Sequence, residues 1–225
     1  MKSLASILNL EQRSKLLLVS ILLFFILPPF LEGNNIGEVA LIGNLYLTLV
    51  FATLQLAAVR ALFWSAAPIA ATSIVLLLLS HYVPTKNLLI MNYLVLAVFL
   101  MLVSVSLFTY LGLDAGITSG HLHVSVSLYF LLGMTWFALY SLLNTLRPGS
   151  FAEGGVPMIR NPPASTMIYF SLSTLTTVGY GDIVAIKPPA RMFATLEAAS
   201  GVLYIAISVA RLVASYQSGP PGKNG

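Results

Sequence analysis

The chain is divided by its sequence into six long apolar segments that are separated by short polar stretches. A helix that spans a bilayer needs about 20 predominantly apolar residues. Only 8% of the residues are charged, whereas a soluble domain carries about a quarter. We therefore expect an all-α membrane protein with six transmembrane helices, over Leu16–Leu31, Val39–Val59, Leu62–Ser80, Leu88–Leu113, Val124–Leu146 and Arg191–Ser215.

The first segment has an alternative interpretation. It is short, ends on Pro28-Pro29 and follows Arg13 and Lys15, which is also typical of a secretory signal peptide. The sequence continues as PPFLEGNN and offers no small-residue cleavage site. A retained span is therefore favoured.

The basic residues predict how the chain is oriented. Six spans place both termini on one side, together with Lys2, Arg13, Lys15, Arg60 and Lys223. The first loop on the opposite side carries Glu32 and Glu38. Because short cytoplasmic segments are enriched in Lys and Arg, we expect an integral protein of the cell's inner (plasma) membrane with both termini cytoplasmic. The basic residues are scattered and form no face for nucleic acid, and the absence of cysteine excludes disulfides and thiolate metal sites.

About 45 residues between the fifth and sixth segments do not fit this scheme. Ala164–Leu175 predicts a short helix that Pro162-Pro163 opens, because proline is tolerated in the first helical turn. At about 1.5 Å per residue it covers about half of the hydrocarbon thickness, so the chain must enter the membrane and return. The returning stretch, LTTVGYGDI, is then non-helical backbone at membrane depth, which is tolerated only beside an aqueous path or inside protein.

The returning stretch also predicts a chemistry. Gly179 and Gly181 lie two residues apart and enter positive-φ conformations without steric cost, so the carbonyl oxygens of Thr177–Gly181 can all point the same way. Such a ladder of neutral oxygens suits a hard cation. One strand cannot surround an ion, whereas four copies around an axis can, and we therefore expect a homotetramer.

The sequence TTVGYGD at residues 176–182 resembles the signature filter of the potassium channel family, and the resemblance extends over about residues 124–215. It implies a re-entrant pore helix and selectivity filter between helices five and six of a prokaryotic-type six-span member. The implied function is passive, potassium-selective conduction. The implied partners are K⁺ as the permeant ion, the lipid bilayer and further copies of the chain, with no other cofactor and no identified protein partner.

The resemblance also implies roles for residues around the filter. The carbonyl groups of Thr177, Val178, Gly179 and Tyr180, with the Thr177 hydroxyl, would replace the hydration shell of K⁺, and Gly181 completes the filter. Filter support would come from Tyr169, Phe170, Ser173, Thr174 and Asp182. We expect a Tyr169–Asp182 hydrogen bond, the Tyr180 ring against Tyr169 and Phe170, the Tyr180 hydroxyl on Thr174, and Ser173 bound to backbone or water.

Residues of the sixth segment would act in the cavity or in gating. Gly201 matches the glycine at which many inner helices bend, although a small residue also permits close helix packing. Val202, Ile205, Val209 and Val213 would line the cavity, although such a stripe is also ordinary lipid or core surface. Glu197 would either bond Ser171 or Thr174 of the pore helix or take part in gating, since a carboxylate within a span is costly and marks function.

Three parts are expected along the chain: a four-helix transmembrane domain over residues 1–118, a pore domain over 119–215, and a short cytoplasmic tail over 216–225. The first part occupies the position of a voltage sensor, but its fourth span, Leu88–Leu113, contains no arginine. Steep voltage gating needs several charges per subunit. We therefore expect a channel without strong voltage gating.

Three other classes of function are alternatives for this sequence. A potassium-transporter-like protein would carry four pore loops in one chain, whereas this chain has one intact loop. A non-conducting regulatory membrane subunit would have no reason to retain the whole filter sequence. A membrane enzyme would need more than His121 and His123, which point apart on a helix and have no carboxylate cluster beside them, so no enzymatic activity is expected.

Overall fold

The computed structural model describes residues 10–31, 35–56, 60–83, 85–113 and 119–217. Over these residues the chain is mostly helical. The helices are α2 (Leu10–Ile26), α3 (Pro28–Leu31), α4 (Asn35–Gln55), α5 (Arg60–Tyr82), α6 (Lys86–Leu113), α7 (Ser119–Leu146), α8 (Ala164–Leu175) and α9 (Pro188–Gln217), and three short strands are β1 (Phe151–Glu153), β2 (Val156–Pro157) and β3 (Ile183–Ala185).

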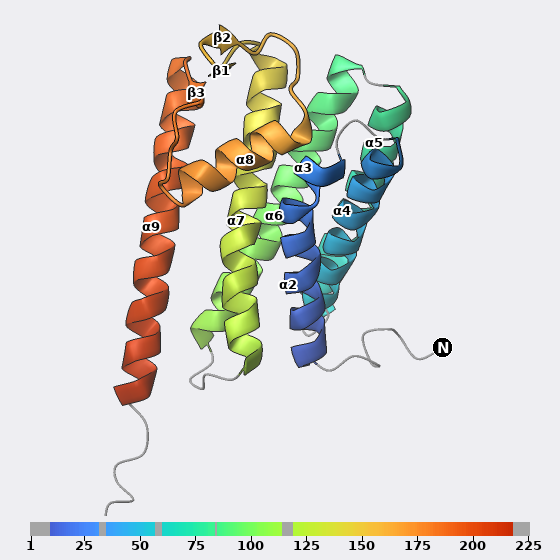
Figure 1. Cartoon of the computed structure of the whole chain (residues 1–225). Coiled ribbons are helices and arrows are strands. Elements are labelled where there is room, and N and C mark those ends of the chain that lie inside the picture. The colour runs from blue at the N-terminus through green and yellow to red at the C-terminus, as the bar shows by residue number, and fades with distance from the viewer. Residues whose placement is uncertain (1–9, 32–34, 57–59, 84, 114–118, 218–225) are drawn as a thin grey trace, which may run out of the picture.

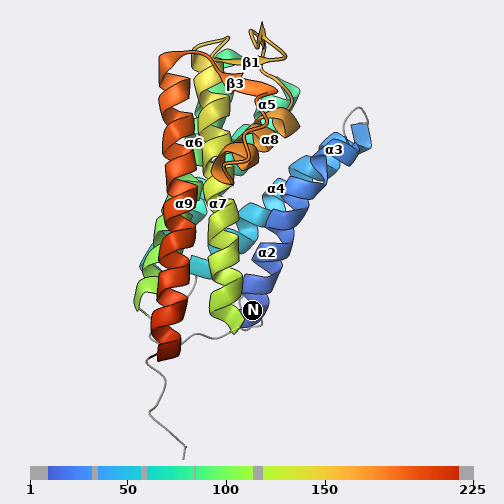
Figure 2. The same ribbon diagram turned by 60° about the vertical axis from the view of Figure 1, so that its left-hand side comes forward.

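Helix α7 lies at the centre of the molecule (Figure 1). Helices α2 and α6 pack along it, α4 packs against α2, and α5 packs against α6. Helices α8 and α9 also pack against α7, and α8 crosses it obliquely in the half of the molecule that carries the strands (Figures 1 and 2). A continuous apolar core joins these elements, and its fully buried members include Leu17, Leu49, Phe99, Leu131 and Tyr140.

Several helices are apolar and long enough to belong in a bilayer. Within the described residues, Lys86–Leu111, Gly120–Leu146 and Pro188–Arg211 meet the length and composition of a membrane span, and Ala66–Ser80 is a shorter apolar helix. These segments confirm a mostly helical protein with membrane-type helices. The full count of six spans stays a prediction.

The predicted first span is wrong in its course. Instead of one helix over Leu16–Leu31, α2 ends at Ile26 and the short α3 begins at Pro28. Proline carries no N–H to continue the hydrogen-bonded ladder and its ring restricts the preceding residue, so the chain breaks where the two prolines begin. The remaining predicted segments correspond to α4, α5, α6, α7 and α9, with ends shifted by a few residues.

The structure also contains a three-stranded antiparallel sheet in the order β2-β1-β3. The expectation of an all-α protein did not include it. Strands β1 and β2 form a hairpin whose turn residues, Gly154 and Gly155, have φ angles of 54° and 83°. Two positive φ angles match the right-handed twist of a tight hairpin, and Gly-Gly is a typical sequence for such a turn. Strand β3 pairs with β1 from Phe151 opposite Ala185 to Glu153 opposite Ile183.

Candidate functional site

Helix α8 occupies Ala164–Leu175 as the sequence predicts. Pro163 precedes it with an extended backbone, at φ −50° and ψ 151°, and needs no hydrogen-bond partner for its nitrogen. At its other end, the N–H groups of Thr176 and Thr177 donate to Leu172 O (3.0 Å) and Thr174 O (2.9 Å). The last carbonyl groups of the helix therefore have partners, and the chain leaves the helix at Thr176.

The backbone beyond α8 alternates in handedness. Thr177, Gly179 and Gly181 have φ angles of 60°, 52° and 83°, and no other non-glycine residue in the described part of the chain has a positive φ. Such alternation turns successive peptide groups the same way, as a row of carbonyl oxygens facing one side requires. A left-handed threonine costs about 1–2 kcal/mol, and residues held in such conformations cluster at functional sites.

A backbone hydrogen bond ties this stretch to α8. The Gly179 N–H donates to Ser173 O at 3.1 Å. Within the described residues the Ser173 side chain makes no bond to the backbone, and its carbonyl group makes the contact instead. The expected bond to water stays a prediction. Ser173 therefore supports the stretch through its backbone.

Asp182 follows the stretch and is held on three sides. The Tyr169 hydroxyl donates to Asp182 Oδ2 at 2.8 Å, which confirms the predicted bond, and this hydrogen bond raises the pKa of Tyr169. The Ile183 N–H donates to Asp182 Oδ1 at 3.0 Å. The Asp182 carbonyl accepts from the N–H of Gly154, in the turn of the hairpin, at 3.0 Å. Asp182 thus joins α8, the returning stretch and the sheet.

The aromatic residues of α8 divide between two faces. The Tyr169 ring stacks on that of Tyr180, with centroids 6.4 Å apart and planes at 9°, which agrees with the expected brace. Phe170 contradicts the expectation, because it is buried against Tyr140 (5.0 Å) and Phe151 (5.2 Å). Successive residues of a helix point about 100° apart, so Tyr169 and Phe170 cannot both face the returning stretch.

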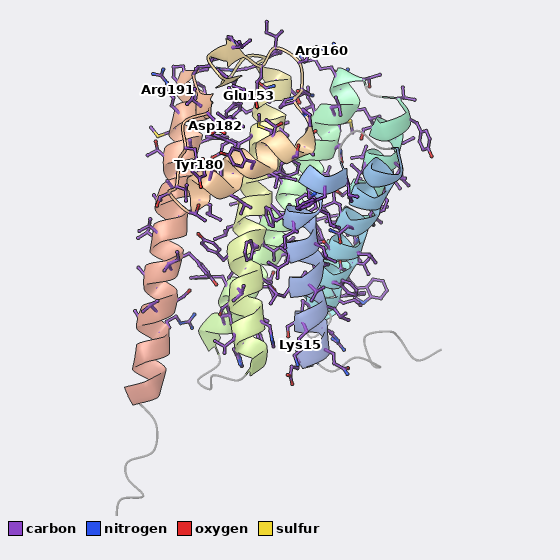
Figure 3. The ribbon with its side chains drawn as sticks, viewed as in Figure 1. Lys15, Glu153, Arg160, Tyr180, Asp182 and Arg191 are labelled. Atoms are coloured by element: carbon purple, nitrogen blue, oxygen red, sulfur yellow. The ribbon has the colours of Figure 1, made fainter. Side chains whose placement is uncertain are left out.

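The expected hydrogen bond from the Tyr180 hydroxyl to Thr174 is likewise absent within the described chain, where Tyr180 is 75% exposed. In Figure 3, Tyr180 and Asp182 lie in the half of the molecule that carries the strands, as do Glu153, Arg160 and Arg191, while Lys15 lies near the opposite end. The stretch after α8 therefore occupies one half of the molecule rather than its full length.

Glu197 of α9 is completely buried. Its carboxyl group accepts a hydrogen bond from the Tyr140 hydroxyl of α7 and lies 2.6 Å from Ser171 Oγ of α8. The Ser171 contact confirms one of the two predicted partners, and Thr174 takes no part. Tyr140 was not singled out from the sequence, because an apolar helix gives no signal for the direction of one tyrosine.

Gly201 lies where α9 crosses the end of α8. A methyl group at this position would overlap the Leu175 carbonyl oxygen and lie 3.1 Å from the carbonyl carbon. Helix α9 runs through Gly201 without interruption. The contact with Leu175 supports the close-packing role for Gly201, and a bend at this residue stays a prediction.

The other predicted residues of α9 lie beyond Gly201. Val202, Ile205 and Val209 are each about half exposed. Val213 lies in α9, but its side chain is outside the described residues, as are positions 218–225 of the predicted tail. Exposed apolar side chains suit a cavity wall, a neighbouring chain or lipid, so the alternatives stated for this stripe stay open.

Comparison with known proteins finds similarity to ion channels over part of the chain. Residues 124–218 match the family model described as "Ion channel". The inward rectifier potassium channel Kirbac3.1 of Paramagnetospirillum magnetotacticum is 29% identical over 86 residues, which are 38% of this chain and 25% of that protein.

Two further relatives are voltage-gated potassium channels. Kch of Escherichia coli is 34% identical over 83 residues, 37% of this chain and 19% of Kch. The channel protein shk-1 of Caenorhabditis elegans is 37% identical over 67 residues, 30% of this chain and 12% of shk-1.

The chain thus spans a quarter or less of the length of these relatives. No solved structure matches it. The matched segment contains α8, the returning stretch and α9, together with most of α7. This segment matches the ion-channel family model, and the relatives that are similar to it are potassium channels.

Proposed function

We propose that four copies of the chain form a potassium-selective channel that conducts K⁺ passively through residues 177–181. The observation that carries this proposal is the alternation of φ at Thr177, Gly179 and Gly181. It provides the backbone that a carbonyl filter needs, at the end of a helix too short to cross a bilayer. The carbonyl groups of Thr177, Val178, Gly179 and Tyr180 are the proposed ligands of K⁺.

The surface of the single chain supports assembly. Val178 and Tyr180 are 53% and 75% exposed. A mostly apolar cavity of about 350 Å³ opens beside them, with Phe25, Phe130 and Ile168 among its other lining residues. Helix α9 is the least buried of the three membrane-type helices. A fourfold arrangement around the returning stretch would cover these apolar surfaces and complete the ring of oxygens.

The first four membrane segments are proposed to sit in the same membrane without acting as a strong voltage sensor. Lys86, the first residue of α6, is the only charged residue in that helix. The cytoplasmic position of both termini and the division into a domain over residues 1–118 and a pore domain over 119–215 are part of the same proposal.

Ion flux from purified protein in liposomes tests the proposal. We expect K⁺ flux well above Na⁺ flux, and loss of the selective flux in Gly179→Asp, because that substitution adds a side chain at φ 52° and a charge beside the ions. The control is Gly43→Ala, because a methyl group at this position meets no atom within 4 Å. An aspartate at Gly43 would place a charge inside an apolar helix and is therefore not used. Equal K⁺ and Na⁺ permeability would refute the proposal, and absence of any flux would favour a regulatory subunit.

A further inference from the structure

A carboxyl group without a counter-ion lies behind the proposed filter. Glu197 is the only charged residue between Arg191 and Arg211 in α9, and it is completely buried between α7 and α8. Among the described residues Lys15 and Glu11 form an ion pair, and Glu197 forms none. Burying an ionised carboxylate without a partner is strongly unfavourable.

Within the part of the chain that the structure describes, the groups that face Glu197 supply no positive charge. Helix α7 contributes the Tyr140 hydroxyl and, farther away, Tyr129, and α8 contributes Ser171. The nearest basic residues along the chain bind elsewhere. Lys187 Nζ donates to Pro148 O at 2.6 Å, and Arg191 Nε donates to Ala185 O at 3.4 Å. The site therefore consists of neutral hydroxyl and carbonyl groups.

A count of protons decides the state of the carboxyl group. Three oxygen–oxygen contacts form one chain, from Tyr140 Oη to Glu197, from Glu197 Oε1 to Ser171 Oγ (2.6 Å), and from Ser171 Oγ to Gly133 O (2.8 Å). Each contact needs one proton. Tyr140 and Ser171 carry one each, so an ionised Glu197 leaves one pair of oxygens facing each other without a proton. A protonated Glu197 supplies the third.

We propose that Glu197 is a neutral carboxylic acid at neutral pH, and that its proton completes a directed hydrogen-bond chain from Tyr140 through Glu197 and Ser171 to Gly133. These hydrogen bonds make Glu197 a positioning residue for the proposed filter, a role that rests on the proposed channel function. Its protonation does not depend on that function.

The position of the Tyr140–Glu197–Ser171–Gly133 hydrogen bonds explains how they influence the proposed filter. Ser171 lies one helical turn before Leu175 on α8, and Glu197 lies one turn before Gly201 on α9. The Ser171–Glu197 bond and the Leu175–Gly201 contact are therefore successive contacts along one helix pair. Thr177, where the alternating backbone begins, is two residues beyond the second contact. Loosening the bond releases the helix that carries the filter.

Infrared difference spectroscopy on the reconstituted protein tests the protonation directly. Glu197→Gln is the comparison, because its amide group donates to Ser171 and accepts from Tyr140 much as the neutral acid does. We expect the difference spectrum at neutral pH to show a carboxylic acid C=O band that the wild type has and the variant lacks. Loss of a carboxylate band instead would overturn the proposal. Glu153→Gln, at an exposed position, is the control and should remove a carboxylate band.

Flux measurements test the positioning role. Glu197→Gln should keep K⁺ flux within about twofold of wild type, whereas Glu197→Ala should lose about tenfold or more, because the Tyr140 and Ser171 hydroxyls lose their shared partner. Raising the pH until Glu197 ionises should reduce wild-type flux reversibly and leave Glu197→Gln less affected. Equal loss in Glu197→Gln and Glu197→Ala would overturn the positioning role. If the wild type conducts no K⁺, the channel proposal fails, and the infrared result still decides the protonation.

Discussion

Gly201 lies directly against the carbonyl group of Leu175, where α9 crosses the last residue of α8. No side chain fits between them, since even a methyl group would overlap the carbonyl oxygen. The helix that ends in the proposed filter therefore rests on bare backbone of α9. This contact gives the glycine a steric role that needs no bending of the helix.

Gly201→Ala is expected to push α8 away from α9. Forcing an extra methyl group into a packed interior typically costs about 1–3 kcal/mol. Thermal unfolding of the reconstituted protein should shift to lower temperature, and K⁺ flux should fall. Gly43→Ala is the matched control, because it places the same methyl group inside α4 with no atom within 4 Å. An unchanged melting temperature with altered opening would instead favour a hinge at Gly201.

Tyr169→Phe is expected to remove the side-chain donor that α8 provides to Asp182. The Ile183 N–H still holds the other carboxylate oxygen, so the outer end of the filter should be weakened without being abolished. Current should decline faster during sustained opening, while K⁺ selectivity in the first milliseconds stays intact. Tyr46→Phe, in α4, is the control for loss of a tyrosine hydroxyl. Immediate loss of selectivity in Tyr169→Phe would contradict this division of roles.

The same bond has a predicted pH dependence. Because the hydrogen bond to Asp182 raises the pKa of Tyr169, the donor is present throughout the neutral range. Its contribution to stability is complete below the pKa of a free tyrosine, about 10, and is lost as the pH rises through the higher value in the folded protein. Current decline should therefore accelerate only in strongly alkaline solution, and Tyr169→Phe should not show this acceleration.

Thr177 combines a left-handed backbone with a hydroxyl group that is a proposed ligand. Thr177→Gly should relieve about 1–2 kcal/mol of backbone strain and at the same time weaken K⁺ binding. We therefore expect stability measured without K⁺ to rise, and stabilisation by added K⁺ to shrink. Thr177→Ser keeps the hydroxyl and should retain the K⁺ effect. Equal K⁺ stabilisation in wild type and Thr177→Gly would show that this hydroxyl is not a ligand.

Voltage dependence is expected to be shallow. Each charge that crosses the membrane field contributes about 2.3 kcal/mol per 100 mV, and α6 has no charged residue after Lys86. Planar-bilayer recordings should give a conductance–voltage relation equivalent to about one charge or less per subunit. A steep relation with several gating charges per subunit would require a sensor elsewhere in the chain.

Local signals in the sequence predict α8 and its end well. Two prolines open the helix, and the glycine-rich stretch ends it, so its bounds follow from backbone chemistry alone. The bond between Tyr169 and Asp182 was predicted by resemblance to the family and is confirmed by the geometry. The break at Pro28 and the Gly154-Gly155 hairpin also had local signals, which the strong apolar pattern around them obscured.

Other features of the site depend on packing and had no such signal. Phe170 points away from Tyr180 because the rotation of α8 is set by its contacts with α7 and the sheet. The positive φ angle of Thr177 could not be predicted, because such a conformation is normally indicated by a glycine in the sequence. Tyr140 meets Glu197 only after α7 and α9 are brought together. Such contacts between distant segments are invisible to any pattern along one helix.

The pairing of β1 with β3 closes the segment between them into a loop whose two ends are already joined. Phe151–Glu153 precedes α8 and Ile183–Ala185 follows the proposed filter, so their ladder brings both ends of the intervening segment together. The loop is thus a structural unit whose two ends are held together by its own backbone hydrogen bonds. A chimera with a related potassium channel, joined outside Phe151 and Ala185, would transfer α8, the proposed filter and the β1–β3 ladder as one piece. A cut at Ala164 and Asp182 instead separates α8 and the proposed filter from the β1–β3 ladder that joins the two ends of the segment.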